Sequence, residues 1–539
     1  MSENQHQKEK TELFRTIWAI ANQLRGSVDG WEFKNYVLGT IFYRYLSEFI
    51  TDKINLQEQE SSDDDSFNYA FLNDDEIDNI ENFKDEVIKE IGFFLYPSEL
   101  FCNVVKNAEK NIDNNDDLNL TINNIFKNIE NSSKGSDAEK CFENLFTDFN
   151  VNNNSLGSTL QSRNKHLANL LIEVSKMKFD YNSSQNSIDL FGDAYEYLMG
   201  MYAANAGKSG GEYFTPQQVS LLLTKLCLIK DDGSYKTHVN KVYDPTCGSG
   251  SLLLKSAKVL HGQTHIDIGF YGQESNPTTY NLCRINMFLH RIPFDKFNIA
   301  CGNTLTEPKH LQDEPFEVIV SNPPYSIKWI GDDDITLIND PRFTSAGVLA
   351  PKSKADFAFI MHSLHHLDNK GKAAIVCFPG IMYRSGAEQK IRQYLITNNF
   401  IDCIIQLPEN LFFGTSIATC IMVLSKHKKD NSILFIDASK EFIKITNSNL
   451  LSDDNIKNIL DTYIQRHNID YVAKLVDLQT IQENKYNLSV NTYVEKQDTQ
   501  EKIDITDLNL QIKNIVAKQN ILRAEIDAII DQIETNHED

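Results

Sequence analysis

With 539 residues, the chain exceeds the roughly 250–300 residues of a single hydrophobic core, and its 41% hydrophobic content is typical of a globular protein with two or three domains. A net charge of −23 argues against tight DNA binding by this chain alone, because cationic contacts with phosphate dominate such affinity. No apolar run approaches the ~18 residues of a membrane span, and the polar opening residues do not predict a signal peptide, so we expect a cytoplasmic protein without a membrane partner.

The first 165 residues are predicted to form an all-helical amino-terminal domain with acidic loops. Apolar residues recur at spacings of three and four in residues 12–24 and 33–50, and the turn signal GSVDG joins the two stretches. Residues 51–150 then carry 24 acidic and 8 basic side chains, a net charge of −16. Most of the net negative charge of the chain therefore lies in this region. The sequence does not reveal the role of the region.

Strand-like and helix-like segments alternate from about residue 240, within a second predicted domain that spans residues 166–475. The strand-like runs are KVYDP (241–245), IGFYGQE (268–274), FNIACGN (297–303), FEVIVSNPPY (316–325), GKAAIVCFP (371–379), IDCIIQLP (401–408) and CIMVLSK (420–426). This alternation is typical of an α/β fold with a doubly wound, largely parallel sheet. Ligands of such sheets bind beyond the carboxyl ends of the strands.

The third predicted domain, residues 476–539, is a helical tail without Gly or Pro. Apolar residues step by four and three along it with one polar interruption, which is typical of a coiled-coil heptad seam. The seam consists of Leu508, Ile512, Ile515, Gln519, Leu522, Ile526, Ile529 and Ile533. Such a helix either packs on its own domain or pairs with another chain, and we expect a subunit contact.

Polar side chains end the first three strand candidates of the sheet. Asp244 precedes a turn in which Gly248 and Gly250 allow the backbone to approach a ligand at the start of a helix. Glu274 ends the second candidate, where an acid can accept hydrogen bonds from both hydroxyls of a ribose. Asn303 ends the third, where it could meet an adenine edge. The turn lacks the GxGxxG of dinucleotide folds, and AGKS (206–209) lacks the upstream glycine of a P-loop.

The fourth strand candidate ends in SNPPY, residues 321–325, where two consecutive prolines stop the strand. The result is a stiff loop that holds the amide of Asn322 and the ring of Tyr325 in fixed positions. The four polar strand ends all lie on one edge of the predicted sheet, which favours a single site over four unrelated strand ends.

This set of motifs resembles the amino-methylating, S-adenosylmethionine-dependent DNA methyltransferases, in which DPTCGSG is similar to the first cofactor motif and NPPY to the catalytic motif. The series WEFKNYVLGTIFYRYLSE (31–48), FGDAYEYLMG (191–200), GGEYFTPQQVSLLL (210–223), DPTCGSG and NPPY more narrowly resembles the modification (methyltransferase) subunit of type I restriction–modification systems. The resemblance implies a Rossmann-like methyltransferase sheet, S-adenosyl-L-methionine as cofactor and adenine N6 as methyl acceptor.

The resemblance also implies roles for individual residues. The catalytic residues would be Asn322, Pro323, Pro324 and Tyr325. The cofactor-binding residues would be Glu212, Tyr213, Phe214, Thr215, Pro216, Gln217, Asp244, Gly248, Ser249, Gly250, Ser251, Glu274 and Asn303. Asn303 stands where such families have an aspartate, although an amide can still read an adenine edge.

The implied chemistry assigns a task to each part of the SNPPY loop. Asn322 Oδ1 and the Pro323 carbonyl are expected to accept hydrogen bonds from the adenine amine, while Tyr325 stacks on a base flipped out of the duplex. Phe412 or Phe413 is expected to help hold that base. Asp356 either caps the helix that it opens or lines the site.

No metal site is expected. The histidines of HSLHH (362–366) share a helical face, but that helix is apolar and methyl transfer needs no metal. Nine scattered cysteines contain no CxxC pair, which favours reduced thiols over disulfides or zinc.

The resemblance implies a complex that acts on double-stranded DNA. No long basic segment after NPPY resembles a target-recognition domain, and no helicase motif appears. We therefore expect a separate specificity subunit, an ATP-dependent restriction and translocation subunit, and a second copy of this chain. The alternatives are a protein-glutamine or RNA methyltransferase that uses the same NPPY chemistry, and an inactive methyltransferase-like scaffold.

Overall fold

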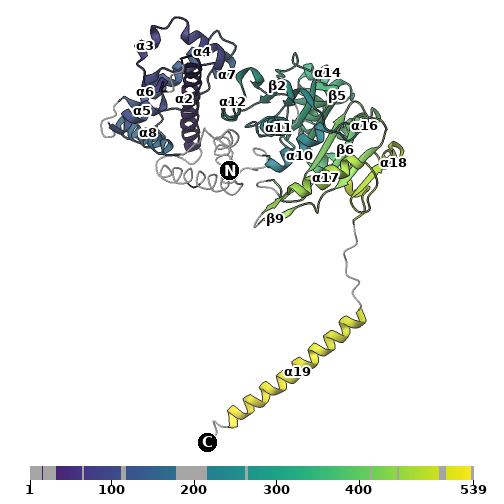
Figure 1. Cartoon of the computed structure of the whole chain (residues 1–539). Coiled ribbons are helices and arrows are strands. Elements are labelled where there is room, and N and C mark those ends of the chain that lie inside the picture. The colour runs from purple at the N-terminus through teal and green to yellow at the C-terminus, as the bar shows by residue number, and fades with distance from the viewer. Residues whose placement is uncertain are drawn as a thin grey trace. The chain divides into compact units, whose positions relative to one another are not determined.

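The computed structural model describes residue 15 and residues 32–62, 66–110, 117–177, 215–261, 265–412, 416–445, 448–496 and 505–535. The chain separates into two compact units, residues 1–494 and residues 495–539 (Figure 1). Within the described residues, no helix is long and apolar enough to cross a membrane. The finer division into three domains stays a prediction.

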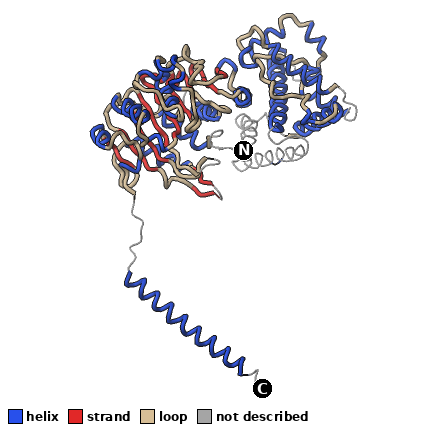
Figure 2. Tube along the Cα trace, turned by 180° about the vertical axis from the view of Figure 1, so that it is seen from behind, coloured by secondary structure: helices blue, strands red, loops and turns tan. Residues whose placement is uncertain are grey.

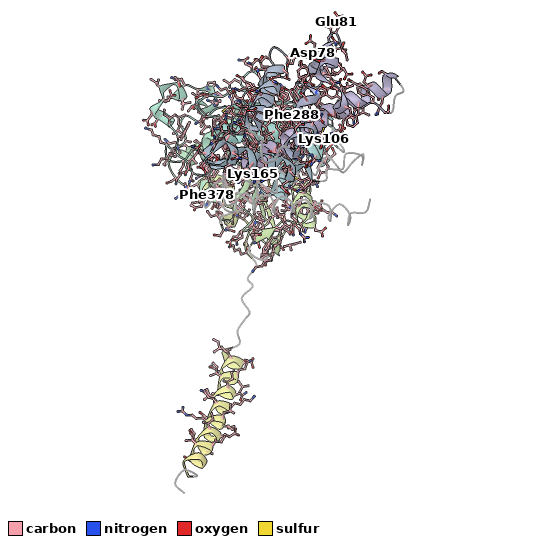
Figure 3. All side chains as sticks on the ribbon, turned by 90° about the vertical axis from the view of Figure 1, so that its left-hand side faces the viewer. Asp78, Glu81, Lys106, Lys165, Phe288 and Phe378 are labelled. Atoms are coloured by element: carbon pink, nitrogen blue, oxygen red, sulfur yellow. The ribbon has the colours of Figure 1, made fainter. Side chains whose placement is uncertain are left out.

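The amino-terminal region consists of helices and the loops between them, as predicted (Figure 1). The helices are α2 (Glu32–Ser62), α3 (Asp74–Asp78), α4 (Phe83–Ile91), α5 (Phe101–Lys110), α6 (Leu118–Ser132), α7 (Glu139–Phe142) and α8 (Leu160–Ser175). The helix predicted over residues 33–50 lies within α2, whereas the helix predicted over residues 12–24 lies outside the described residues apart from Arg15. Acidic side chains such as Asp78 and Glu81 are exposed on this region (Figure 3).

A nine-stranded sheet with the order β11-β8-β6-β7-β5-β4-β1-β2-β3 forms the next region (Figures 1 and 2). Its strands are β1 (His238–Asp244), β2 (His265–Glu274), β3 (Phe297–Cys301), β4 (Phe316–Ser321), β5 (Leu367–Cys377), β6 (Ile401–Gln406), β7 (Cys420–Ser425), β8 (Ile433–Asp437) and β11 (Ala473–Val476). All seven predicted strand runs are present, and the α/β fold class is confirmed.

The strand directions bring four strand ends to one edge of the sheet. β1 lies parallel to both β2 and β4, and β2 lies parallel to β3. The strand order therefore reverses between β1 and β4, which is where doubly wound sheets bind their ligands. The sheet is less parallel than expected, because β7 is antiparallel to β5 and β6 and β11 is antiparallel to β8.

Helices cover both faces of the sheet (Figures 1 and 2). One face carries α10 (Gln217–Leu228), α11 (Ser251–His261), α12 (Pro277–Leu289) and α17 (Asp453–Gln465). The other carries α13 (Ile335–Ile338), α14 (Pro341–Thr344), α15 (Asp356–His366), α16 (Ala387–Thr397) and α18 (Leu478–Glu483). Because successive strand residues point to opposite faces, Val318 and Val320 of β4 join the first core and Ile319 joins the second.

Helix α12 joins the helical region to the sheet. Phe288 packs against Phe42 of α2 and Phe142 of α7, with ring centroids 6.0 and 4.8 Å apart. The Asn286 amide on the same helix donates to the Ser249 carbonyl at 2.9 Å. One helix therefore supports both the amino-terminal region and the glycine turn after β1.

Several smaller elements complete the described fold. The strands β9 (Ile443–Ile445) and β10 (Ser448–Leu450) form an antiparallel hairpin. The short 3₁₀ helices are η1 (Tyr69–Phe71), η2 (Pro97–Glu99), η3 (Asn154–Leu156), η5 (Phe294–Lys296), η6 (Gly331–Asp333), η7 (Pro379–Met382) and η8 (Val490–Thr492). The second unit contains α19 (Ile505–Thr535), the predicted tail helix, and every side chain described in it, residues 505–531, is exposed.

Candidate active site

The turn after β1 presents bare backbone at the start of α11. Gly248 has φ +54°, and no atom lies within 4 Å of the place where a Cβ would stand. Gly250 has φ +85°, and a Cβ there would lie 2.8 Å from Cys283 Sγ on α12. A side chain at either position would be strained, and at Gly250 it would also push α12 away. The turn and Ser251, the first residue of α11, therefore form a surface that a ligand can approach closely.

Asp244 ends β1 with a fully buried side chain. Its Oδ1 accepts a hydrogen bond from the Thr246 N–H at 3.0 Å, whereas no partner for Oδ2 is present among the described residues. Burial raises the pKa of Asp244 to about 8, and the charge of Glu274 contributes in the same direction. A buried carboxyl oxygen without a partner favours a ligand that brings a donor or a positive charge.

This carboxyl group should make stability depend on pH. The folded state holds the Asp244 proton more tightly than the unfolded chain, so its contribution to stability is present at pH 4 and is lost as the pH rises to about 8. Relative to the parent, Asp244→Asn is therefore expected to gain about 2–5 kcal/mol in the free energy of unfolding at pH 8.5, and little at pH 4. Urea denaturation at both pH values measures this difference.

Asp402 of β6 provides a control, because its pKa is shifted in the opposite direction to that of Asp244. Burial alone would raise its pKa, but Arg466, 2.8 Å from Oδ1, and Lys372 hold the pKa below its usual value. Asp402→Asn removes one member of a buried ion pair and is expected to destabilise the protein at pH 8.5. If both variants lost stability at pH 8.5, the account of Asp244 would be wrong.

Glu274 ends β2 and holds the glycine turn in place. Its Oε2 accepts from the Gly248 N–H at 3.1 Å and its Oε1 accepts from the Asn276 N–H at 2.8 Å. The Glu274 backbone carbonyl accepts from the Gly302 N–H at 2.9 Å. A carboxylate offers about four acceptor positions, so this half-buried group can also accept hydrogen bonds from the hydroxyls of a ligand.

Asn303 is exposed at the start of the loop that follows β3. Its Oδ1 accepts from the Leu305 N–H at 3.0 Å, so the side chain stabilises its own turn. The next residue, Thr304, donates from Oγ1 to the Pro245 carbonyl at 2.5 Å. The loops that follow β1 and β3 are therefore joined directly.

Arg342 of α14, which the sequence analysis did not identify, supports that loop from within the protein. Its side chain is only 2% exposed, and Nη1 and Nη2 donate to the carbonyls of Thr304 and Leu305, each at 2.8 Å. Nε donates to the Asp340 carboxylate at 3.0 Å, and Nη1 also donates to His362 Nδ1 at 3.0 Å. Nη2 also donates to Asp340 Oδ2 at 2.6 Å, so all five N–H groups of the guanidinium are used, which fixes the loop backbone firmly.

His362 and His366 of α15 belong to this buried network. Because Arg342 only donates, His362 Nδ1 must accept, and Nε2 then carries the proton toward the Tyr243 hydroxyl at 3.0 Å. Burial holds the pKa of His362 well below its usual range and lowers that of His366 to about 4. In the described part of the chain, no group of three His, Cys, Asp or Glu side chains could hold a metal ion.

The Asn322 amide is fixed by hydrogen bonds at both of its polar atoms. Nδ2 donates to Thr215 Oγ1 at 3.0 Å, and Oδ1 accepts from the Tyr325 hydroxyl at 2.6 Å. The preceding residue, Ser321, shares a 2.9 Å hydrogen bond between hydroxyls with Thr246 in the glycine turn. The SNPPY loop therefore lies beside the turn after β1 and the segment that precedes α10.

Asp356, the first residue of α15, fixes the other end of the SNPPY loop. Its Oδ1 and Oδ2 accept from the Ser326 N–H at 3.2 and 3.1 Å, where Ser326 has φ +51°. Burial raises the pKa of this carboxyl group and the hydrogen bond from Ser326 lowers it. The sequence left open whether Asp356 caps α15 or lines the site. The contacts favour a place at the site, because Asp356 holds the residue that follows Tyr325.

Some predicted residues lie outside the described residues: Glu212, Tyr213, Phe214 and Phe413. Thr215 and Pro216 are buried directly before α10, and Gln217 opens that helix. Phe412 is only 3% exposed and belongs to an apolar core. Of these segments, the structure brings Thr215 into direct contact with Asn322.

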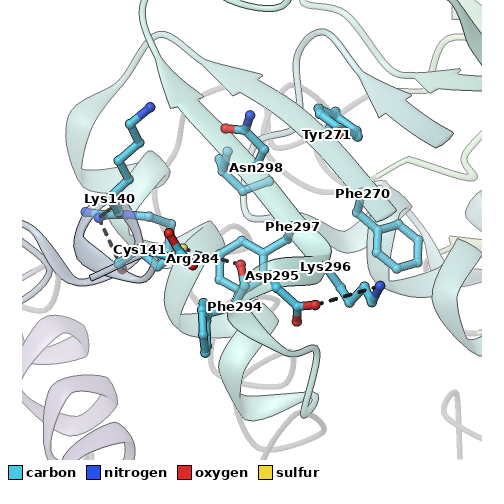
Figure 4. Close-up of a pocket in the computed structure, with 12 residues that line it drawn as sticks. Lys140, Cys141, Phe270, Tyr271, Arg284, Phe294, Asp295, Lys296, Phe297 and Asn298 are labelled. Carbon is cyan, nitrogen blue, oxygen red and sulfur yellow. Dashed lines mark hydrogen bonds and ion pairs between the residues drawn. The ribbon is translucent and has the colours of Figure 1, made fainter. Parts of the chain in front are cut away.

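A cavity of about 250 Å³ lies elsewhere, where α7 meets the edge strand β3 (Figure 4). Arg284 of α12 lines it and donates from Nη1 to the carbonyls of Lys140, Cys141 and Glu143 at 3.1, 3.3 and 2.9 Å. None of the predicted site residues lines this cavity. The cavity lies at the interface between the helical region and the sheet. The candidate active site therefore remains at the strand ends.

Two family models match the chain. The model described as N-6 DNA Methylase matches residues 186–502, and the model described as HsdM N-terminal domain matches residues 13–174. The first covers the sheet region and its flanking helices, and the second covers the helical region. Together they leave little of the chain outside a family match except the tail helix.

Known proteins are similar to this chain over most of its length. The methylase subunit of the type I restriction enzyme MpnII from Mycoplasma pneumoniae is 47% identical over 99% of this chain and 98% of its own length. The methylase subunit of MjaVII from Methanocaldococcus jannaschii is 31% identical over 69% of this chain and 64% of its own length. The solved methyltransferase subunit of a type I restriction–modification system from Streptococcus thermophilus superposes with a TM-score of 0.77 at 34% identity, over 90% of this chain and 100% of that one.

Proposed function

The chain belongs to the N-6 DNA methylase family, among the methylase subunits of type I restriction enzymes, and on that premise we propose that it transfers a methyl group from S-adenosyl-L-methionine to N6 of an adenine in double-stranded DNA. The observation that carries the proposal is the Asn322 amide, which is fixed beside the glycine turn at the edge where β1 and β4 reverse the strand order.

The residues at this edge fit the proposed cofactor. S-adenosyl-L-methionine, when bound, supplies a methyl group activated by a sulfonium charge. The unpartnered buried oxygen of Asp244 suits its cationic amino-acid end, and the open space at Gly248 suits close contact with the turn. Glu274 can accept hydrogen bonds from the ribose hydroxyls, and Asn303 would contact the adenine edge. Residues 212–217 would cover the methionine end.

Arg342 is expected to act on cofactor affinity through the loop that it holds. Arg342→Lys keeps the charge but cannot reach both carbonyls and His362, so the dissociation constant for S-adenosyl-L-methionine should rise about tenfold, measured by calorimetry. Arg392→Lys is the matched control, because Arg392 is equally buried and donates to the carbonyls of Ile381, Arg384 and Tyr486 rather than to a cofactor loop. Equal cofactor affinity in the two variants would contradict this role.

The SNPPY loop is proposed to activate the adenine amine. The lone pair of this amine is delocalised into the ring, so hydrogen bonds to Asn322 Oδ1 and the Pro323 carbonyl favour a pyramidal nitrogen whose lone pair faces the methyl group. An amide oxygen has two lone pairs, and Oδ1 can keep the Tyr325 hydroxyl while it accepts an N–H. The ring of Tyr325 stacks on a base flipped out of the duplex, because N6 is inaccessible within the stack.

Partners are proposed to supply what this chain lacks. Its net charge of −23 suits a subunit for which a specificity subunit provides most of the DNA affinity and recognises the sequence. An ATP-dependent subunit would carry translocation, and a second copy of this chain is expected in the complex. The exposed seam of α19, from Leu508 to Ile529, suits a helix that packs against a partner chain.

A transfer assay with methyl-labelled cofactor tests the proposal. The chain, assembled with its cognate specificity subunit, is offered duplex DNA, ribosomal RNA and glutamine-containing peptides in parallel. Label is expected in DNA only. Label in peptide or RNA would favour the rival methyltransferase classes, and cofactor binding without any transfer would favour a scaffold.

A further inference from the structure

The hairpin formed by β9 and β10 leaves the sheet at the same edge as the SNPPY loop. β4 is parallel to β5, β7 is antiparallel to both β5 and β6, and β6 is parallel to β8. The carboxyl end of β8 at Asp437 therefore lies on the edge that carries Asn322. The hairpin starts six residues later and projects from the sheet region in both views (Figures 1 and 2).

The hairpin is also fixed to the loop that follows β6. The Asn449 N–H donates to the Asn410 carbonyl at 2.9 Å, and the Asn449 amide donates to the Glu409 carbonyl at 2.7 Å. Residues 409 and 410 follow β6 and belong to the segment whose aromatic residues are predicted to help hold the base. The hairpin thus has a fixed position relative to the edge at which DNA would bind.

Large apolar side chains are exposed on this hairpin. Phe442, Ile443 and Ile445 are 37%, 51% and 45% exposed. Among the described residues, β9 and β10 form a separate two-stranded sheet that no further strand extends. Exposed apolar side chains grouped on a projecting element indicate a contact surface.

The exposed charges of the hairpin are positive. Lys444 is exposed on it and Lys440 is exposed in the loop that leads to it, in a protein whose net charge is −23. The one acid of the segment, Glu441, is turned toward α17, where it accepts hydrogen bonds from the amides of Asn455 and Asn458 at 2.8 and 3.2 Å. The nearest other exposed acids are Glu409, in the loop bound by Asn449, and Asp453 and Asp454 at the start of α17, so Lys444 is the exposed charge on the hairpin strands themselves.

We propose that this hairpin contacts the DNA duplex beside the target base, an inference that rests on the proposed function. Ile443 and Ile445 would lie against base edges or sugars in a groove, as apolar wedges do in other DNA-binding proteins, and Lys440 and Lys444 would pair with phosphates. β8 is four strands from β4 in the sheet order, so at ~4.8 Å per strand the carboxyl end of β8, from which the hairpin extends, lies about 19 Å along the edge. That distance corresponds to about six base pairs of duplex.

The test uses the full chain assembled with its specificity subunit and a duplex that carries the methylated sequence. The variants are the double substitution Ile443→Ser with Ile445→Ser, and Lys444→Glu. Ile80→Ser and Lys89→Glu are matched controls, because both residues are exposed in the acidic helical region. Fluorescence anisotropy measures DNA affinity at several salt concentrations, and calorimetry measures cofactor affinity of the chain alone.

The double variant is expected to bind DNA about tenfold more weakly than its control, and Lys444→Glu to reduce the slope of log affinity against log salt by about one. Cofactor affinity should stay unchanged in both. DNA affinities within twofold of the controls would overturn the inference. So would loss of co-elution with the specificity subunit, which would assign the hairpin to that protein. Neither result touches the proposed function, which fails only if the parent complex does not methylate DNA.

Discussion

Asn322→Ala is expected to lower the rate of methyl transfer to DNA by about 1,000-fold, because it removes a positioned hydrogen-bond acceptor for the adenine amine. Cofactor affinity should change by less than about threefold, since no proposed cofactor contact is lost. Single-turnover kinetics with saturating cofactor measure the chemical step, and co-elution with the specificity subunit confirms assembly.

Two further substitutions separate the effect of orienting the Asn322 amide from the effect of its acceptor oxygen. Thr215→Val removes the hydrogen bond that orients Asn322 Nδ2 but keeps Oδ1, so a loss of only about tenfold is expected. Asn322→Asp keeps an acceptor and should fall between the other two variants. An assembled Asn322→Ala complex that methylates DNA at the parental rate would refute the catalytic role of the SNPPY loop.

Glu274→Ala is expected to weaken cofactor binding about 100-fold, since charge-assisted hydrogen bonds to two hydroxyls contribute on the order of 3 kcal/mol. It also removes the acceptor of the Gly248 and Asn276 N–H groups, so the glycine turn loses its support. At saturating cofactor the rate should recover to within a few-fold of the parent. Equilibrium binding and the split between KM for the cofactor and kcat measure the two effects.

Glu307→Ala is the control for that variant. Glu307 is an exposed acid in the loop after β3, and its side chain lies 3.5 Å from Lys309 rather than at the glycine turn. It should bind cofactor as the parent does. Equal cofactor affinity in Glu274→Ala and Glu307→Ala would contradict the proposed contact between Glu274 and the cofactor.

The polar strand ends could be predicted because they depend on local signals. Apolar runs of strand length, each followed by a helical pattern, located the ends of β1, β2 and β4 within a few residues of Asp244, Glu274 and Asn322. The carboxyl ends of parallel strands meet at one edge, so the assembly of the site followed from the fold class. The hydrogen bonds between those ends then bring their loops together.

Strand direction and the outer strands were harder to predict. β7 is apolar throughout, and such a run fits either direction. The signal lay in the connection from β6 to β7, because its thirteen residues contain Pro and Gly and show no amphipathic helical pattern for a parallel crossover. β8 and β11 are short strands next to polar segments, and periodicity does not separate them from loops.

The supporting contacts of the site could not be predicted from the sequence. Arg342 follows a proline in a polar stretch and would be taken as a surface residue, yet it is buried because backbone carbonyls from another loop meet it. The hydrogen bond between the Ser326 N–H and Asp356 could not be predicted either, because the two residues are thirty positions apart in the sequence. The hydrogen bond from Tyr325 to Asn322 also depends on the turn geometry that the prolines impose, not on spacing alone.

The central claim is that this chain methylates adenine N6 in DNA, and mapping methylated adenines in host DNA tests it most directly. DNA is compared from cells with the parent chain, with the Asn322→Ala variant and without the chain. The account predicts N6-methyladenine at one recurring sequence in the first sample and at none of those positions in the other two. Identical maps in all three samples would contradict it.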